Sequence, residues 1–428
     1  MAKPTLALIP ASQGSKLFSV LPSSGVGDFD FSRGSAATRI NSQGLIETVV
    51  SGQSRLDYPM IDGVQKGCPH HILEPARTQL VQYSEDFSNA YWTKEKTSIT
   101  SNAVISPDGT LNASKLFEDS SNGLHRTYTD LITTVQGDDY TTSIFAKKGG
   151  RNIFGIQISN GAQPFVWFNL DKGIVELQES SIVGKIESLP NGWYKCTATW
   201  NSSSATNDRA FIQLAKSISS TTYTGDGTSG VYIWGAMLEV GSFPTSYIPN
   251  NGNAAGVTRS AETASGAGNS TTFNDSEGVL MAELSALTDD GSYRLISISD
   301  GTQNQRITIL YDITDNKIYV QCVNGTTQAF IPFVPQSISN NNKVAMKYKA
   351  NDFALWVNGF EVGTDTNGSI PIGLDTLSFD RGDLLSPFYG KTKQIQYYNS
   401  ALTDSEIEQL TSWTSFTDMA NGQQYSIK

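Results

Sequence analysis

Paired carboxylates could give this chain a chemistry, because two Asp or Glu side chains on either side of a sugar linkage can hydrolyse it. One arrangement of such a pair is Glu-x-Asp-x-x-Glu on a single strand, which places nucleophile and acid on the same face. No Glu of the sequence is followed by Asp at the second position. Carboxylates from separate strands could still converge, so a glycan depolymerase is kept as a less favoured alternative.

Nucleophilic catalysis lacks its usual partners in this sequence. The chain has three histidines, His70, His71 and His125, and no Gly-x-Ser-x-Gly motif for a serine hydrolase. We interpret His70 and His71 as two surface or interface imidazoles and not as a metal site. His125, between Leu124 and Arg126, is interpreted as a loop residue or a ligand contact. The sequence therefore predicts that the protein is not an enzyme.

Two patterns could bind ions. Residues 225–230 match Gly-x-Gly-x-x-Gly, but a strand-like run follows them where a phosphate cradle needs a helix, so they predict a turn. Asp312, Asp315 and Asn316, and the pair at 138–139, place oxygen donors near turns, as calcium requires. Because Asp and Asn are also the usual turn residues, no catalytic metal or cofactor is predicted, and a structural calcium ion is left as an option.

Aromatic side chains could stack on sugar rings. In the run 165–170, one side carries Val166, Phe168 and Leu170, and Trp356 lies between the apolar residues 355 and 357. The candidate carbohydrate-binding residues are Phe165, Trp167, Asn169 and Trp356. The alternative is that both tryptophans fill a second layer or a subunit interface, because large aromatic side chains mostly end up buried.

These residues must be positioned by strands, because short runs of alternating apolar and polar residues recur along the chain. Such runs occur at 141–146, 154–158, 166–170, 194–200, 210–214, 296–298, 307–311, 318–322, 344–348 and 353–357. Asn358-Gly359 is the clearest hairpin turn, and residues 403–406 form a capping box that predicts one short C-terminal helix. We therefore expect an all-β protein with two antiparallel β-sandwich or jelly-roll domains in tandem.

The composition along the chain predicts the boundaries of these domains. Residues 1–75 are predicted to be an extended arm with a hairpin turn at 41–44 that packs on a following domain or on neighbouring subunits. The first sandwich is expected at 76–249, a linker rich in Asn, Gly, Ala, Ser and Thr at 250–275, and the second sandwich at 276–428.

The overall charge excludes several functions. The 428 residues carry a formal charge of −11 and no Lys/Arg run longer than the pair at 147–148, so no nucleic-acid partner is expected. Residues 1–19 are a poor signal peptide, and no stretch approaches the ~20 apolar residues of a membrane span. Cys196 and Cys322 lie in alternating runs and are expected to be buried thiols.

Several segments resemble known families. FSRGSAATRIN (31–41), RLDYP (55–59), LEPART (73–78) and YSEDFSNAYW (83–92) resemble the opening of many bacteriophage tail and structural proteins. YIWGAMLE (232–239) through SYIP (246–249) is similar to the closing strand of carbohydrate-binding-module-like jelly rolls. ALWVNG (354–359) with YYNSALTDSEI (397–407) resembles laminin-G-like and concanavalin-A-like sandwiches.

The resemblance implies a virion structural or adhesion protein, displayed on the surface of the phage particle as a tail fibre, tail tip or head fibre. Its expected partners are other virion proteins, further copies of itself in a homo-oligomer (a trimer is one option) and bacterial surface glycan. The alternative is a purely architectural capsid or tail component without a ligand.

Overall fold

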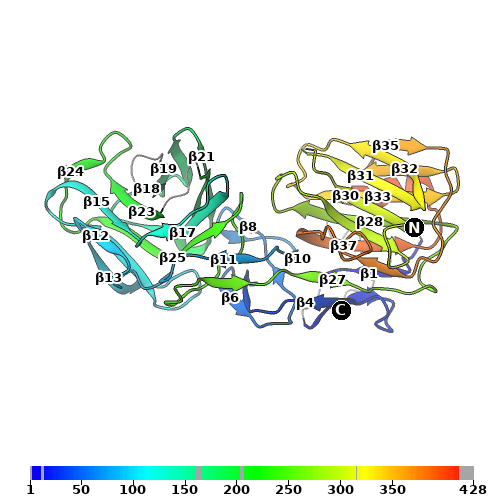
Figure 1. Ribbon diagram of the computed structural model, residues 1–428, viewed down its shortest axis with the longest axis horizontal. Helices are drawn as coiled ribbons and strands as arrows, with labels where there is room; N and C mark the ends of the chain where they lie inside the picture. Colours follow the sequence, from blue (N-terminus) through cyan, green and yellow to red (C-terminus); the bar gives the residue numbers. More distant parts are fainter. Residues whose placement is uncertain (1, 11–13, 160–164, 203–206, 315, 414–428) are drawn as a thin grey trace.

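The computed structural model describes residues 2–10, 14–159, 165–202, 207–314 and 316–413. Two β-sandwich lobes lie end to end, with strands of the N-terminal segment between them (Figure 1). All pairings between the named strands are antiparallel, and one short α-helix lies near the C-terminal end of the described residues. The prediction of an all-β protein of antiparallel sandwiches with a short C-terminal helix is confirmed.

The first lobe consists of two sheets that enclose a core. One sheet contains, in spatial order, β13 (Thr97–Val104), β14 (Ala113–Glu118), β25 (Gly230–Val240), β17 (Asp139–Gly149), β22 (Trp193–Asn201) and β21 (Ile182–Ser188). The other contains β12 (Thr93–Glu95), β15 (Asn122–Tyr128), β23 (Asn207–Ala215), β18 (Ile153–Ser159), β19 (Val166–Asn169) and β20 (Ile174–Gln178). Successive side chains of a strand point to opposite faces, so Ala210, Ile212 and Leu214 of β23 enter the core while Phe211 and Gln213 face outward.

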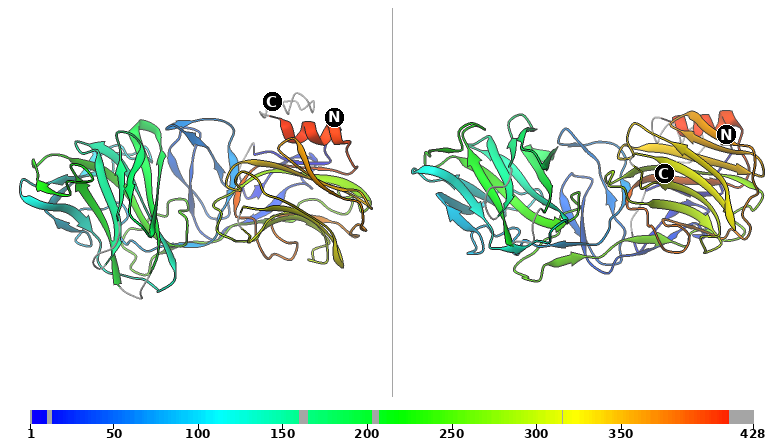
Figure 2. Two further views of the ribbon diagram at one scale, coloured as in Figure 1. Left: turned by 90° about the horizontal axis from the view of Figure 1, so that it is seen from above. Right: turned by 45° about the horizontal axis from the view of Figure 1, so that its top comes forward.

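The second lobe has the same plan. One sheet contains β3 (Ser19–Leu21), β1 (Leu6–Leu8), β37 (Gly390–Tyr398), β28 (Glu277–Ala286), β33 (Asn342–Lys349), β34 (Phe353–Val357) and β35 (Phe360–Asp365). The facing sheet contains β32 (Thr326–Phe333), β31 (Ile318–Asn324), β30 (Gln305–Tyr311), β29 (Arg294–Ser299) and β36 (Thr376–Ser378). Helix α1 (Asp404–Ser412) lies on the outer side of the first of these sheets (Figure 2).

The first 75 residues supply strands to the second lobe, while Ile46 among them packs in a cluster with Phe145 and Trp193 of the first lobe. β1 pairs with β37, and its Leu6 and Leu8 are fully buried in the second core. β10 (His70–Leu73) pairs with β37 as well as with β7 (Leu56–Asp57). β4 (Phe29–Ser32) pairs with β27 (Thr263–Ser265), which comes from the segment predicted to be a linker. These residues therefore supply strands and core side chains to the second lobe, while their anchoring role stays a prediction.

Two antiparallel segments connect the lobes. The chain enters the first lobe along β11 (Arg77–Gln79) and leaves it along β26 (Val257–Arg259), and these two strands pair with each other. The connection is therefore a two-stranded ribbon.

Several local predictions are confirmed. Residues 41–44 join β5 (Ala37–Ile40) to β6 (Ile46–Val49), and Asn358 and Gly359 join β34 to β35 with positive φ angles of 51° and 90°. The capping box at Thr403 and Glu406 starts α1. Cys196 and Cys322 are buried free thiols.

The interpretation of the histidine pair is wrong. His70 and His71 are 3% and 1% exposed, because β10 is covered by β7 and β37 on its two edges and by the neighbouring segments. Burial lowers the pKa of His71 to about 3, so this ring is neutral at physiological pH.

The first testable prediction concerns the N-terminal strand. Leu8→Ala should reduce the free energy of unfolding by about 2–5 kcal/mol, because it opens a cavity in a closed core. Val20→Ala in the adjacent β3 is the control, since its side chain is 41% exposed and its loss should stay within ~0.5 kcal/mol. Urea denaturation followed by circular dichroism measures both. Equal losses in the two variants would contradict the placement of β1 in the core.

Candidate functional site

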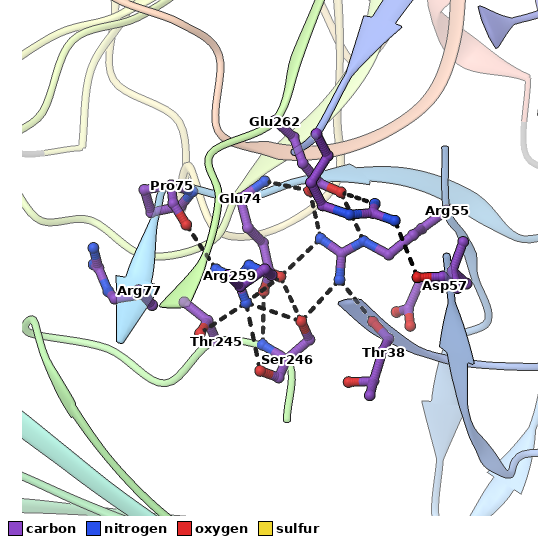
Figure 3. A network of polar contacts seen from close by, with 12 residues as sticks. Thr38, Arg55, Asp57, Glu74, Pro75, Arg77, Thr245, Ser246, Arg259 and Glu262 are labelled. Carbon is purple, nitrogen blue, oxygen red and sulfur yellow. Dashed lines mark hydrogen bonds and ion pairs between the residues drawn. The ribbon is translucent and has the colours of Figure 1, made fainter. Parts of the chain in front are cut away.

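Five charged side chains meet at the junction between the lobes. Figure 3 labels Arg55, Glu74, Arg259 and Glu262 of this group. Arg33 follows β4, Arg55 precedes β7 and Glu74 follows β10, so the three N-terminal motifs each contribute one member. Arg259 ends β26 and Glu262 precedes β27. All five side chains are at most 3% exposed. We call this group the junction network.

Two carboxylates bridge three guanidinium groups in this network. Glu262 Oε1 accepts from Arg33 Nη1 at 2.7 Å and from Arg55 Nε at 2.9 Å. Glu74 Oε2 lies 2.8 Å from Arg55 Nη2 and 2.9 Å from Arg259 Nη1. A buried charge is tolerated only when it is paired and hydrogen-bonded, and this geometry satisfies that condition.

The third arginine leaves an excess of positive charge, and backbone oxygens compensate for it. Arg33 donates to Val50 O, Arg55 to Thr38 O and Arg259 to Pro75 O, each at 2.7 Å. Burial alone would raise the pKa of Glu74, but Arg259 and Arg55 outweigh it and hold that pKa well below its usual range. Glu74 is therefore ionised at neutral pH.

The junction network also reaches the end of the first lobe. Ser246 donates to Glu74 through its backbone N at 2.8 Å and its Oγ at 2.6 Å. Thr245 accepts from Arg259 and donates to the buried Glu239 of β25. The network thus joins the N-terminal segment, the first lobe and the returning crossover, and it places no reactive group on the surface. Its role is to fix the two lobes relative to each other.

A second candidate site lies on the outer face of the β15–β23–β18–β19 sheet. The rings of Tyr128 and Phe211 lie 4.9 Å apart, and the Arg126 guanidinium lies 4.9 Å from the Phe211 centroid. Arg209 lies 5.2 Å from the centroid of Tyr128. These contacts hold the two rings in place by cation–π interactions.

The same face carries three of the predicted site residues. Phe165 and Trp167 stack at 4.9 Å with 21° between their planes. They lie over Gly155, where a Cβ would come within 2.9 Å of both rings, so the absence of a side chain there makes room for them. Asn169 donates to Glu176 Oε2 at 2.8 Å and accepts from Asp171 N, which supports the turn after β19.

Two side-chain amides lie among these rings. Gln213 and Gln157 are opposite Gly155 and Phe211 in the strand register and are 2% and 5% exposed. We name this surface the aromatic face. Its members are Arg126, Tyr128, Gln157, Phe165, Trp167, Asn169, Arg209, Phe211 and Gln213. The residues that sequence reasoning missed lie on β15, β18 and β23. The runs at 154–158 and 210–214 predicted parts of β18 and β23, so their alternation could have located Gln157, Phe211 and Gln213. No strand was predicted at β15, so Arg126 and Tyr128 had no such signal.

Burial limits the predicted aromatic platforms. Trp167 is 4% and Asn169 7% exposed, while Phe165 is half-buried. Trp356 is 6% exposed and packs with Ile407 and Leu410 of α1, in the other lobe. The structure therefore brings Phe165, Trp167 and Asn169 together and separates them from Trp356. Carbohydrate binding by these four residues stays a prediction.

The remaining chemical motifs have structural roles. Asp226 accepts from Thr228 N and Ser229 N, which confirms the turn at 225–230. His125 is fully buried, with its ring nitrogens 2.8 Å from Lys96 O and 3.1 Å from Tyr223 O. Its interpretation as a loop residue or ligand contact is wrong, because it lies in the buried face of β15.

The calcium option gains no support in the described ranges, where no group of three or more His, Cys, Asp or Glu side chains is arranged to hold a metal ion. Asn316 donates to Pro335 O and accepts from Ile338 N, and Asp139 accepts from Asn201. Asp315 lies outside the described residues. Within the same ranges, no helix has the length and apolarity that crossing a membrane requires.

Comparison with known proteins gives only remote similarities. No family model matches the chain, and no curated protein matches it. Among solved structures, Ruminococcus gnavus IT-sialidase CBM40 bound to alpha2,3 sialyllactose is 18% identical over 34% of this chain and 87% of its own, with a TM-score of 0.29. Sheep galectin-11 in complex with glycerol is 10% identical over 30% and 86%, with a TM-score of 0.19.

Domains LG4-5 of the mouse laminin alpha1 chain are 11% identical over 82% of this chain and 96% of their own, with a TM-score of 0.22. At these scores, none of the similarities carries a functional argument for this chain.

The second testable prediction removes one network charge. Glu262→Gln should destabilise the protein by about 3–5 kcal/mol, because it leaves buried arginines without their carboxylate. Glu47→Gln breaks the partly exposed pair with Arg39 and should cost at most ~1 kcal/mol. Chemical denaturation of both variants checks the difference. A similar small loss in both would show that the junction network adds little to stability.

The third testable prediction is a pH dependence. Because the pKa of Glu74 is lowered in the folded state, its stabilisation is complete above the unfolded value of about 4.3 and is lost as the pH falls through the folded value. The stability difference between wild type and Glu74→Gln should therefore be largest at neutral pH and shrink below about pH 4. Urea titrations across this range measure it, with the exposed Glu361→Gln as the control. A difference that stays constant with pH would contradict the assignment.

Proposed function

We propose that this chain is a non-enzymatic adhesion protein of a bacteriophage particle and that it binds carbohydrate on the aromatic face. One observation carries this proposal: aromatic rings and side-chain amides lie side by side on one outer sheet face. Sugar rings offer an apolar face for stacking and hydroxyl groups for hydrogen bonding, so such a surface suits them.

The arrangement is preorganised for binding. Arg126 and Arg209 hold Tyr128, and the stacked Phe165 and Trp167 support each other. Gln213 is 2% exposed and lies opposite Gly155 in the strand register. Its side-chain amide can both donate and accept hydrogen bonds. A ligand would thus meet groups that pay little further ordering cost.

The junction network supports the virion role. The motifs that resemble phage structural proteins supply Arg33, Arg55 and Glu74, which hold the lobes in one orientation. A fixed orientation suits a protein displayed on a particle surface among copies of itself and other virion proteins. Assembly as a homo-oligomer, such as a trimer, and contact with bacterial glycan are part of this proposal.

A purely architectural role is the second candidate. The low exposure of Trp167 and Trp356 favours it, because a buried ring stabilises a lobe without reaching a ligand. In that case the lobes are spacers whose function is to assemble with other virion proteins.

The fourth testable prediction separates these roles. Tyr128→Ala and Phe165→Ala should each weaken binding to host surface polysaccharide ~2- to 12-fold, the range that follows from losing ~0.5–1.5 kcal/mol of aromatic contact. Phe330→Ala is the control, because this ring is 47% exposed but lies in the second lobe. Glycan arrays followed by titration of the wild type and the variants provide the measurement.

Two outcomes would overturn the proposal. Absence of glycan binding, together with particles that fall apart without the protein, indicates the architectural role. Release of reducing ends from the polysaccharide indicates a depolymerase.

A further inference from the structure

A cleft of about 690 Å³ lies between the two lobes and is distinct from the aromatic face. Small-molecule sites usually enclose ~300–1,000 Å³. Strands β21 and β22 of the first lobe form one wall, and residues 57–62 with Ile72 and Lys391 form the other. Residues 242–247 close a further side, so the lining comes from both lobes and the N-terminal segment.

The wall in the first lobe is a polar strand face. Glu187 is paired in register with Lys195, and Lys185 with Thr197, so their side chains lie on the same face as Thr199. Lys185 Nζ and Glu187 Oε1 form an ion pair at 2.8 Å. This wall therefore offers hydroxyl groups, amines and one carboxylate.

The opposite wall places Asp57 near Lys391. Asp57 Oδ1 accepts from Ile40 N at 2.8 Å, and its Oδ2 lies 3.2 Å from His70 Nε2. Lys391 is on β37, in register with Ile72 of β10 and Ser285 of β28. The two oxygens of Asp57 are thus occupied by groups other than Lys391.

Two ammonium groups of the cleft lack a carboxylate partner. Among the described residues, no Asp or Glu oxygen lies within 4.0 Å of Lys195 Nζ or Lys391 Nζ, and Lys195 donates only to Thr245 O at 2.8 Å. Arg39, which also lines the cleft, is paired with Glu47, and Glu74 belongs to the junction network. Ammonium groups in a concave surface that form no direct ion pair can attract an anionic group of a ligand.

The ammonium groups of Lys195 and Lys391 both interact electrostatically with the Glu187 carboxylate. Burial raises the pKa of Glu187, but Lys185, Lys195 and Lys391 together outweigh it and lower that pKa. Lys391 belongs to the second lobe and Lys195 to the first, so their fields meet across the cleft.

We propose that the cleft between the lobes binds an acidic saccharide, whose anionic group is held by Lys195 and Lys391. Its hydroxyl groups bind Glu187, Thr197 and Thr199, which accept or donate hydrogen bonds. A bare anion fits less well, because the volume of the cleft exceeds that of one ion. This site goes beyond the binding proposed for the aromatic face and does not rest on it.

The junction network prepares this site. Glu74, Thr38 and Ser246 line the cleft and are also held by Arg55. The two walls therefore keep their separation before a ligand arrives, which lowers the ordering cost of binding.

The fifth testable prediction uses the full chain and isothermal titration with trigalacturonate, neutral maltotriose and inorganic phosphate. Trigalacturonate should bind. Lys195→Met or Lys391→Met should each reduce the affinity for trigalacturonate about tenfold or more, because each substitution removes one positive charge that pairs with the ligand's carboxylates at a partly buried site. Lys393→Met, on the same strand as Lys391, should change little. Lys195→Gln keeps a donor for Thr245 and provides a second variant if the methionine variant does not fold.

The outcomes are distinct. Added salt should weaken trigalacturonate binding. Tyr128→Ala should leave trigalacturonate binding unchanged, because Tyr128 lies on the aromatic face, so failure of the proposal for that face would not remove binding in the cleft. Phosphate that binds as tightly as trigalacturonate overturns the saccharide assignment. Absence of trigalacturonate binding, an equal loss in Lys393→Met, or binding of maltotriose with the same affinity overturns the site itself.

Discussion

The buried junction network is the constraint on which the arrangement of this protein depends. Arg33, Arg55 and Arg259 bring three positive charges into a region without solvent, and they are stable there only because Glu74 and Glu262 stand between them. Each carboxylate belongs to a segment that leads into a lobe or out of it. Moving one lobe against the other would separate these ions in a medium that solvates them poorly. The lobes therefore have one favoured orientation. This orientation sets the width of the cleft between them and the direction in which the aromatic face of the first lobe points.

The order of the strands shows how the chain reaches this arrangement. The first lobe is built from one continuous stretch, whereas the second takes β1 and β10 from the beginning of the chain and β37 from near its end. Pairing β1 with β37 closes a loop of almost the entire described chain, and such non-local contacts form slowly. The first lobe can complete its core from its own strands, while the second needs both ends of the described chain.

Local patterns of the sequence predict many strands, turns and the helix well, but they predict poorly which segments pack against them. Alternation located strands such as β22, β30 and β34, Asn358-Gly359 a hairpin and Thr403 the start of α1, because each depends on neighbouring residues. It did not locate β1, β10, β15 or β27. Which face of a strand is covered depends on distant segments: α1 covers Trp356, and β7 with β37 encloses His70 and His71. The partners in the junction network are likewise far apart, since Arg33 and Glu262 are separated by 229 positions in the sequence. A sequence motif can indicate that such residues matter, but it does not predict which distant residues they contact.

The paired strands β11 and β26 have a mechanical consequence. The chain enters and leaves the first lobe through this ribbon, so that lobe is an insertion within the second. A force that pulls the first lobe away is carried by two covalent connections at once, side by side, and each bears part of the load. A single flexible tether would let the distal lobe swing freely. The two-stranded connection lies next to the ion pairs of the junction network and resists rotation of the first lobe. A force applied to the far end of the first lobe is therefore transmitted as a torque to the second lobe.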